Sequence, residues 1–220
     1  MVAVRFKDLC IDAVDPKSAA EFWGQALGLQ AQPARKGWVL TGPTPQHSIW
    51  INQVPEPKTV KNRVHLDVRT HSVAELTALG ATEVGPVRGW TVMTDPDGQE
   101  FCAFERKRPP EYRLADLVVD AADPRTIAGW WAKLFGGRSP IAERGYCDIA
   151  GIEGLPWRKF TFLLVPEAKT VKNRVHWDVH ADPDELQAAG ATLLQRPRRG
   201  ADWHVMADPE GNEFCVFAEE

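Results

Sequence analysis

The sequence predicts an α+β protein that consists of a tandem repeat of one folding unit. Ten of the eleven residues in KTVKNRVHLDV (58–68) return in KTVKNRVHWDV (169–179). Two more stretches repeat in the same order: DLCIDAVDPKSAAEFW from Asp8 returns as DLVVDAADPRTIAGWW, and DPDGQEFCAF from Asp95 returns as DPEGNEFCVF. A repeat of this length defines the unit of folding, so fold and function must be considered for each half.

The composition is that of an ordinary globular protein. The chain has 220 residues, of which 44% are hydrophobic and 25% charged, and its net charge is −4. Charges of both signs are interspersed, so nothing predicts binding to nucleic acid or to a membrane surface. No apolar run approaches the ~20 residues of a membrane span, and residues 1–7 lack the apolar core of a signal peptide. The cysteines form no CxxC pair, which favours reduced thiols and a cytoplasmic location.

Each half opens with a strand and a helix. In residues 8–13 apolar and polar side chains alternate, which is the period of a half-buried strand. Asp15 then supplies an N-cap, Pro16 a first helical residue, and Gly28 a C-cap. Between the caps runs one apolar helix stripe: Ala19, Phe22, Trp23, Ala26 and Leu27. The second half repeats this scheme from Asp116.

Short strands complete each half. In the first half the sequence predicts a second short helix at 73–79 and strands at 38–40, 49–53, 64–68, 90–93 and 100–104. The last two strands are joined by Asp95-Pro96-Asp97-Gly98, a tight turn because proline fixes φ and glycine accepts φ > 0. The halves are predicted to be domains 1–107 and 113–220, with a linker at 108–112.

Together these motifs resemble the vicinal oxygen chelate superfamily of glyoxalases and bleomycin-resistance proteins, and its glyoxalase-like branch in particular. The strand-Asp-Pro-helix opening, the Leu-Gly helix end and the DPDG(N/Q)EF turn carry the resemblance, which covers essentially the whole chain. It implies two tandem glyoxalase-like domains, each of two βαβββ modules that form a cupped mixed sheet. It also implies a monomer, because four modules in one chain form an internal pseudo-dimer that single-domain relatives make by dimerising.

The resemblance implies where a metal would bind: on the first and last strands of the modules. In the first half His65 matches the family's ligands, Asp8 replaces a His or Gln, and Cys102 replaces a Glu. The second half repeats this set as Asp116, His176 and Cys215. Neither half offers a carboxylate on its fourth strand. We therefore expect no metal cofactor, and the alternative is zinc or another divalent metal held by Asp, His and a thiolate.

Strand alternation predicts which polar residues face the inside of each cup. In the first half they include Asp8, His65, Asp67 and Cys102. In the second half they include Asp116, His176, Asp178 and Cys215. Two interpretations stay open. Either these side chains satisfy one another as a buried polar network, or they line a pocket in which His65 or His176 moves protons.

The nine tryptophans indicate the kind of ligand. Several lie on helix stripes, and Trp177 lies on the helix-facing side of its strand, so these are predicted to be core. Trp50, Trp90 and Trp203 lie on or beside the curved strands, where an aromatic wall would suit a planar or hydrophobic molecule. His204 lies beside Trp203 and is predicted to join the ligand-binding residues of the second half.

The sequence thus predicts a protein that binds a small hydrophobic or aromatic organic molecule in a cup, without a metal, as sequestering resistance proteins do. The alternative is a lyase, isomerase or epimerase with His65 or His176 as general base, with or without a divalent metal. Neither nucleic acid nor a membrane is expected as a partner.

Overall fold

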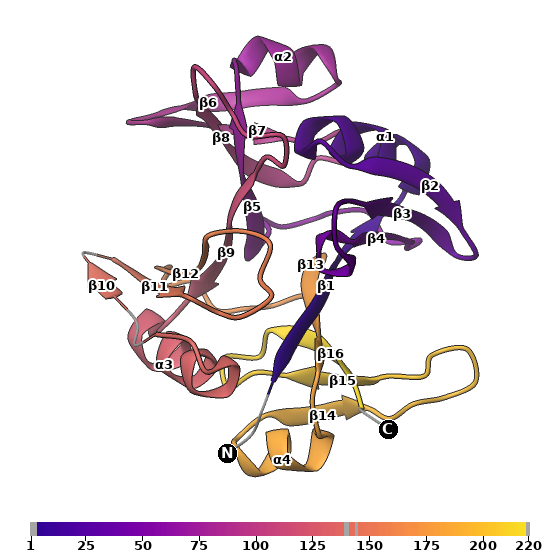
Figure 1. The fold of residues 1–220 in the computed structure, drawn as a ribbon, viewed down its shortest axis with the longest axis vertical. Helices are drawn as coiled ribbons and strands as arrows, with labels where there is room; N and C mark the ends of the chain where they lie inside the picture. Colours follow the sequence, from indigo (N-terminus) through magenta and orange to yellow (C-terminus); the bar gives the residue numbers. More distant parts are fainter. Residues whose placement is uncertain (1–3, 139–140, 144, 219–220) are drawn as a thin grey trace.

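Two eight-stranded mixed sheets make up most of the fold (Figure 1). The structure, a computed structural model, describes residues 4–138, 141–143 and 145–218. Along the chain the elements fall into four modules, each with one strand, one helix and three further strands. None of the helices in the described ranges is both long and apolar enough to span a membrane.

The four modules have closely similar outlines. Module 1 comprises β1 (Arg5–Ala13), α1 (Pro16–Leu27), β2 (Gln30–Ala34), β3 (Gly37–Thr41), the short 3-10 helix η1 (Pro45–His47) and β4 (Ile49–Gln53). Module 2 comprises β5 (Val64–Thr70), α2 (Val73–Ala78), β6 (Thr82–Val87), β7 (Trp90–Thr94) and β8 (Glu100–Glu105). Module 3 comprises β9 (Leu114–Ala121), α3 (Pro124–Phe135), β10 (Ile141–Glu143), β11 (Tyr146–Ala150) and β12 (Lys159–Leu164). Module 4 comprises β13 (Val175–His180), α4 (Pro183–Ala188), β14 (Thr192–Gln195), β15 (His204–Ala207) and β16 (Glu213–Phe217).

The predicted linker, 108–112, lies between β8 and β9, where module 2 ends and module 3 begins. The outer ends of the predicted domains, at residues 1 and 220, fall outside the described residues.

Each sheet joins modules from different halves of the chain. The outer-module sheet, of modules 1 and 4, has the strand order β14-β15-β16-β13-β1-β4-β3-β2. The inner-module sheet, of modules 2 and 3, has the order β10-β11-β12-β9-β5-β8-β7-β6. Indigo β1 accordingly lies beside orange β13 in Figure 1. The α+β class and the two tandem domains are confirmed. The expectation that the two modules of one half share a sheet is corrected, because each sheet combines one module from each half.

The middle of each sheet is an antiparallel pair of module-opening strands. In the outer-module sheet β1 pairs with β13, so that Asp8 lies opposite Asp178 and Cys10 opposite His176. In the inner-module sheet β5 pairs with β9, and Asp67 lies opposite Asp116. The last strand of each module flanks this pair in parallel. Because side chains alternate across a strand, this register gathers the predicted cup residues on one face of each sheet.

Helices cover the other face of the sheets. Asp15 caps α1 by accepting two backbone N–H groups, and Gly28 ends the helix at a φ of 71°. The α1 stripe is buried as predicted, and on α3 the buried Trp131 packs edge-on against Trp177, 5.2 Å between ring centres. Trp177 is 1% exposed, which confirms that it is a core residue. Large side chains buried this fully each contribute roughly 2 kcal/mol or more by removing apolar area from water.

Contacts between a helix and a turn hold together the two modules of each half. Trp23 Nε1 on α1 donates to Asp95 Oδ2 at 2.9 Å, in the turn between β7 and β8. In the second half Trp131 Nε1 on α3 donates to Asp208 Oδ2 at 3.2 Å. Burial raises the pKa of Asp95 to about 6. The repeated Asp-Pro turns are therefore structural elements that fasten one module to the next.

The repeated KTVKNR segments tie one half of the chain to the other. Arg63 Nη1 donates to Glu167 O at 2.5 Å, and its Nη2 donates to Asp120 O at 2.8 Å. Arg174 Nη1 makes the corresponding bond to Glu56 O at 2.8 Å. These contacts confirm that the segment before each cup strand is a joint between modules.

Candidate functional site

The outer-module sheet carries a buried cluster of polar side chains at its centre, and the face that bears it is called the outer cup. One donor atom each from Cys10, His176 and Asp178 lies within 4.8 Å of the others, and all three residues are buried. Cys10 Sγ is 3.7 Å from both carboxylate oxygens of Asp178. Asp8 and Cys215 lie opposite Asp178 on its two neighbouring strands. The tertiary structure thus brings together predicted residues from both halves.

Lys7 places an ammonium group on this cluster. Its Nζ is 2.6 Å from Asp8 Oδ2, 3.9 Å from Asp178 Oδ2 and 4.1 Å from the centre of the Phe217 ring. Trp50 Nε1 donates a hydrogen bond to the same oxygen of Asp8 at 3.0 Å. Two carboxylates and an aromatic face therefore hold an internal cation, with the predicted Trp50 in the same group. No sequence pattern pointed to Lys7, because it lies in a β-bulge where the alternation breaks.

The inner-module sheet carries the corresponding cluster, and its face is called the inner cup. Donor atoms of His65, Asp67 and Cys102 lie within 4.8 Å of one another, and His65 Nε2 is 3.5 Å from Asp67 Oδ1. Asp116 lies opposite Asp67 on the neighbouring strand. This cluster is the more accessible of the two, since the Asp67 side chain is 13% exposed and that of Asp178 only 5%.

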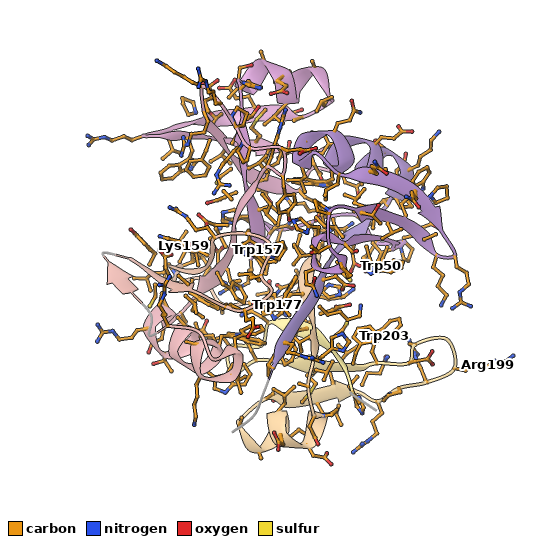
Figure 2. All side chains as sticks on the ribbon, in the orientation of Figure 1. Trp50, Trp157, Lys159, Trp177, Arg199 and Trp203 are labelled. Atoms are coloured by element: carbon orange, nitrogen blue, oxygen red, sulfur yellow. The ribbon has the colours of Figure 1, made fainter. Side chains whose placement is uncertain are left out.

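Beside the inner cluster, Lys159 and Asp148 form an ion pair that no sequence pattern predicted. Asp148 also accepts a hydrogen bond from Thr161 Oγ1 at 2.8 Å. In the strand pairing Lys159 lies opposite Asp116. In Figure 2 Lys159 lies on the left of the view and Trp203 on the right. The register of β11, β12 and β9 creates this group, and register between strands is a tertiary property.

A pair of stacked aromatic rings lies on the face of each cup. Trp90 stacks on Phe104 with ring centres 5.7 Å apart and planes at 29°. Trp203 stacks on Phe217 in the same way, at 5.6 Å and 28°. Alternation along β8 and β16 puts each phenylalanine on the same face as the cup cysteine two residues before it. Neither phenylalanine was among the predicted ligand-binding residues, although strand alternation already puts Phe104 on the face of Cys102 and both belong to the repeated EFC(A/V)F motif.

His204 lies on the opposite face of its sheet from the outer cluster. It is opposite Val216, which is fully buried, whereas its neighbour Val205 is opposite Cys215. Successive residues of a strand point to opposite faces, so His204 belongs to the helix-covered side. The prediction that His204 lines the cup is therefore wrong. It was based on the neighbouring Trp203, and residues next to each other in a strand point to opposite faces.

Burial sets the protonation of both clusters. It raises the pKa of Asp178, and the adjacent Asp8 raises it further. It raises the pKa of the Cys102 thiol to about 12, again with an aspartate adding to the shift. Burial lowers the pKa of His176, so this imidazole is neutral near pH 7. The outer cluster therefore presents a neutral imidazole and the inner cluster a protonated thiol, each beside acidic groups.

A cavity of about 710 Å³ lies outside the cups, where the two KTVKNR segments meet. Lys61 pairs there with Asp120 and Lys172 with Asp12, each lysine with an acid from the other half. The predicted site residues all lie elsewhere. Because these charges are already paired within the protein, we assign the cavity to the joint between the halves.

Comparison with protein families explains the repeated architecture. A glyoxalase-like domain model matches the sequence twice, over residues 8–104 and 116–217. The chain belongs to the glyoxalase-like domain family. Every predicted site residue of this glyoxalase-like chain falls inside one of the two matches, and its resemblance to the vicinal oxygen chelate superfamily is confirmed.

Solved structures share the whole fold of this glyoxalase-like chain. Glyoxalase I from Zea mays is 14% identical, with a TM-score of 0.66 over 98% of this chain and 92% of its own. A putative dioxygenase from Bacillus subtilis is 12% identical, with a TM-score of 0.63 over 97% and 84%. The cppA protein from Streptococcus pneumoniae is 12% identical, with a TM-score of 0.51 over 100% and 98%. A comparison with curated sequences finds no match. At these identities the likeness concerns the fold.

The residues of this glyoxalase-like chain do not fit the hard divalent ion that the family implies. Such ions prefer oxygen and imidazole ligands, whereas Cys102 and Cys215 present thiols on the last strands. In the outer cup the Lys7 ammonium is already bound to Asp8. A Cys–His–Asp set would suit zinc better, which makes zinc the metal to test.

Proposed function

We propose that this glyoxalase-like protein binds and sequesters a small hydrophobic or aromatic organic molecule in its inner cup, without a metal. The observation that supports the proposal is the stacked pair of Trp90 and Phe104 on the same sheet face as the paired His65 and Asp67. An aromatic surface with a few polar groups beside it is the chemistry of a site for a planar small molecule.

The inner cup is favoured over the outer cup because its groups are reachable. Trp90 is 36% exposed, so one aromatic surface is open to a ligand. In the outer cup the Lys7 side chain lies over the Phe217 ring and against the carboxylates. A ligand there would have to displace a side chain of the protein.

Substitution of Trp90 tests this assignment. Trp90→Ala removes one ring of the stack and is expected to weaken binding of an aromatic compound by about tenfold. The matched change in the outer cup, Trp203→Ala, is expected to leave the affinity unchanged. A thermal-shift screen of aromatic compounds selects the ligand, since binding to the folded state alone raises apparent stability, and calorimetry then gives the affinities.

Metal independence is tested in the same titrations. Treatment with EDTA is expected to leave the affinity unchanged, and elemental analysis to find no stoichiometric transition metal. Binding that is lost with EDTA, or equal affinity of Trp90→Ala and wild type, would contradict the proposal.

A second candidate function is proton transfer by His65. Its imidazole lies 3.5 Å from Asp67 Oδ1 in the accessible cup, an arrangement in which a carboxylate orients a general base. His176, the other candidate base, is buried. For an enzyme, His65→Gln abolishes turnover of a bound compound; for a sequestering protein, the same variant shows no turnover to lose and binds with a modest loss of affinity.

A further inference from the structure

The two cups differ at the residue that precedes the cup aspartate. Lys7 precedes Asp8, and Ala115 precedes Asp116, at the same place in the repeated motif. A β-bulge occurs at both places, which leaves each of these residues outside the strand pairing. Lys7 and Ala115 are therefore equivalent in the structure as well as in the sequence.

The outer cup shows what this position can hold. The Lys7 ammonium lies against Asp8 and Asp178 and above the ring of Phe217. Charge-assisted contacts with carboxylates and the attraction between a cation and an aromatic face both stabilise a positive charge there. The outer cup is thus a cation site that the protein fills itself.

The inner cup repeats the two aspartates and the phenylalanine but has no ammonium at this position. Its Lys159 lies opposite Asp116 on the neighbouring strand and is paired with Asp148. Asp116, Asp67 and Phe104 take the places of Asp8, Asp178 and Phe217 in the repeated pattern. The Oδ1 atoms of Asp67 and Asp116 are both buried, and neither accepts a hydrogen bond within the part of the chain that the structure describes. Burial and then Asp67 raise the pKa of Asp116 to about 6, and the positive charges of Arg158 and Lys159 act in the opposite direction.

The cations around the inner cup are engaged elsewhere. Arg69 Nη1 donates to a backbone carbonyl of β9 at 3.4 Å. Lys159 pairs with the acid on β11. Arg106 is exposed, 5.6 Å from the Phe104 ring centre, and donates to the carbonyl of the preceding residue. Among the described residues, no lysine or arginine forms an ion pair with Asp67 or Asp116.

We infer that the inner cup binds an organic cation, an ammonium group carried on an aromatic molecule, where the outer cup holds its own Lys7. The inference rests on the proposed function and narrows its ligand class: the aromatic part stacks on Trp90 and the ammonium lies between Asp67 and Asp116. A neutral compound of the same shape would leave Asp67 and Asp116 without an ion-pair partner from the ligand.

Calorimetry with a charged and a neutral probe tests this. The wild-type protein is expected to bind one equivalent of benzylammonium, and to bind benzyl alcohol, which has nearly the same shape, about ten- to a hundredfold more weakly. Ala115→Lys supplies the inner cup with its own ammonium and is expected to abolish binding of the cation. Asn has nearly the same shape as Asp but no charge. Asp116→Asn is therefore expected to lower the affinity for the cation by about tenfold or more and to leave the affinity for benzyl alcohol unchanged.

Lys7→Ala is the matched control, and it is expected to leave the affinity of the inner cup for the cation unchanged. Equal affinity for the two probes, with both weakened by Trp90→Ala, would overturn the cation inference and leave the proposed function standing. Cation binding that survives both Ala115→Lys and Asp116→Asn would also overturn it. If neither these probes nor any neutral aromatic compound binds, both proposals fall.

Discussion

Asp116 is the carboxyl group in the inner cup whose titration the fold changes most clearly. Burial and its neighbour Asp67 raise its pKa to about 6, from about 3.9 for an exposed aspartate. The folded protein therefore holds this proton more tightly than the unfolded chain does. Its stabilising contribution is complete below about pH 4 and is lost as the pH rises through about 6.

Replacing Asp116 by Asn is expected to flatten the pH dependence of stability. The free energy of unfolding of the wild type, relative to that of Asp116→Asn, should fall between about pH 4 and about pH 7, because the amide does not titrate. Asp95, whose pKa burial also raises to about 6, is present in both proteins and leaves a residual slope. Urea unfolding at a series of pH values measures the effect, and parallel profiles for the two proteins would contradict it.

The elements of each half are held together by hydrogen bonds from helix to turn. The α1 helix belongs to the outer-module sheet, whereas the turn it contacts through Trp23 belongs to the inner-module sheet. The α3 helix makes the reverse connection through Trp131. The two sheets are thus fastened to each other twice by equivalent contacts.

Trp23→Phe is expected to lower the free energy of unfolding by about 1–3 kcal/mol, because Asp95 loses its indole donor in a buried place. The smaller ring keeps much of the packing against Phe101, whose ring centre is 5.2 Å away. Trp131→Phe removes the equivalent bond to Asp208, whose Oδ2 keeps a second donor in Asn212 Nδ2 at 3.2 Å, so a smaller loss is expected. Urea unfolding measures both variants. A loss well under 1 kcal/mol in each would show that these hydrogen bonds do not hold the modules together.

The whole molecule is assembled by exchange of modules between its halves. Each sheet needs β1 or β5 from the first half and β13 or β9 from the second. One chain thereby forms the arrangement that two identical chains could form by symmetry, and we propose that this 220-residue chain, at 24.5 kDa, is a monomer.

The isolated first half, residues 1–107, is expected to form a homodimer. Alone it exposes the pairing edges of β1 and β5, and unpaired edges recruit another strand. Light scattering coupled to size-exclusion chromatography measures the molar mass and so distinguishes a monomer from a dimer. The 220-residue chain serves as the monomeric control. A folded monomer of 1–107 would contradict the expectation.

Strand alternation predicted correctly which polar residues come together on one sheet face, and the failures of the local patterns have a common cause. The alternation that put Asp8, His65 and Cys102 on one face is a property of a single strand. Alternation did not predict the place of Lys7, because a β-bulge interrupts the period there. It did not predict the ion pair of Lys159, because the partner lies on another strand. His204 was misplaced because it was assigned by its chain neighbour and not by alternation.

The sequence by itself determined the modules, the ends of the first helix at Asp15 and Gly28, and the residue types that each module brings to its cup. These follow from capping, periodicity and repetition, all of which act over a few residues. Only the tertiary structure decided that Asp8 meets Asp178 from the other half, and that the Lys7 ammonium reaches both carboxyl groups of the outer cup, whereas Ala115 supplies no cation to the inner cup. Pairing between modules depends on which strand edges meet across long separations in the chain, and no local pattern encodes that choice.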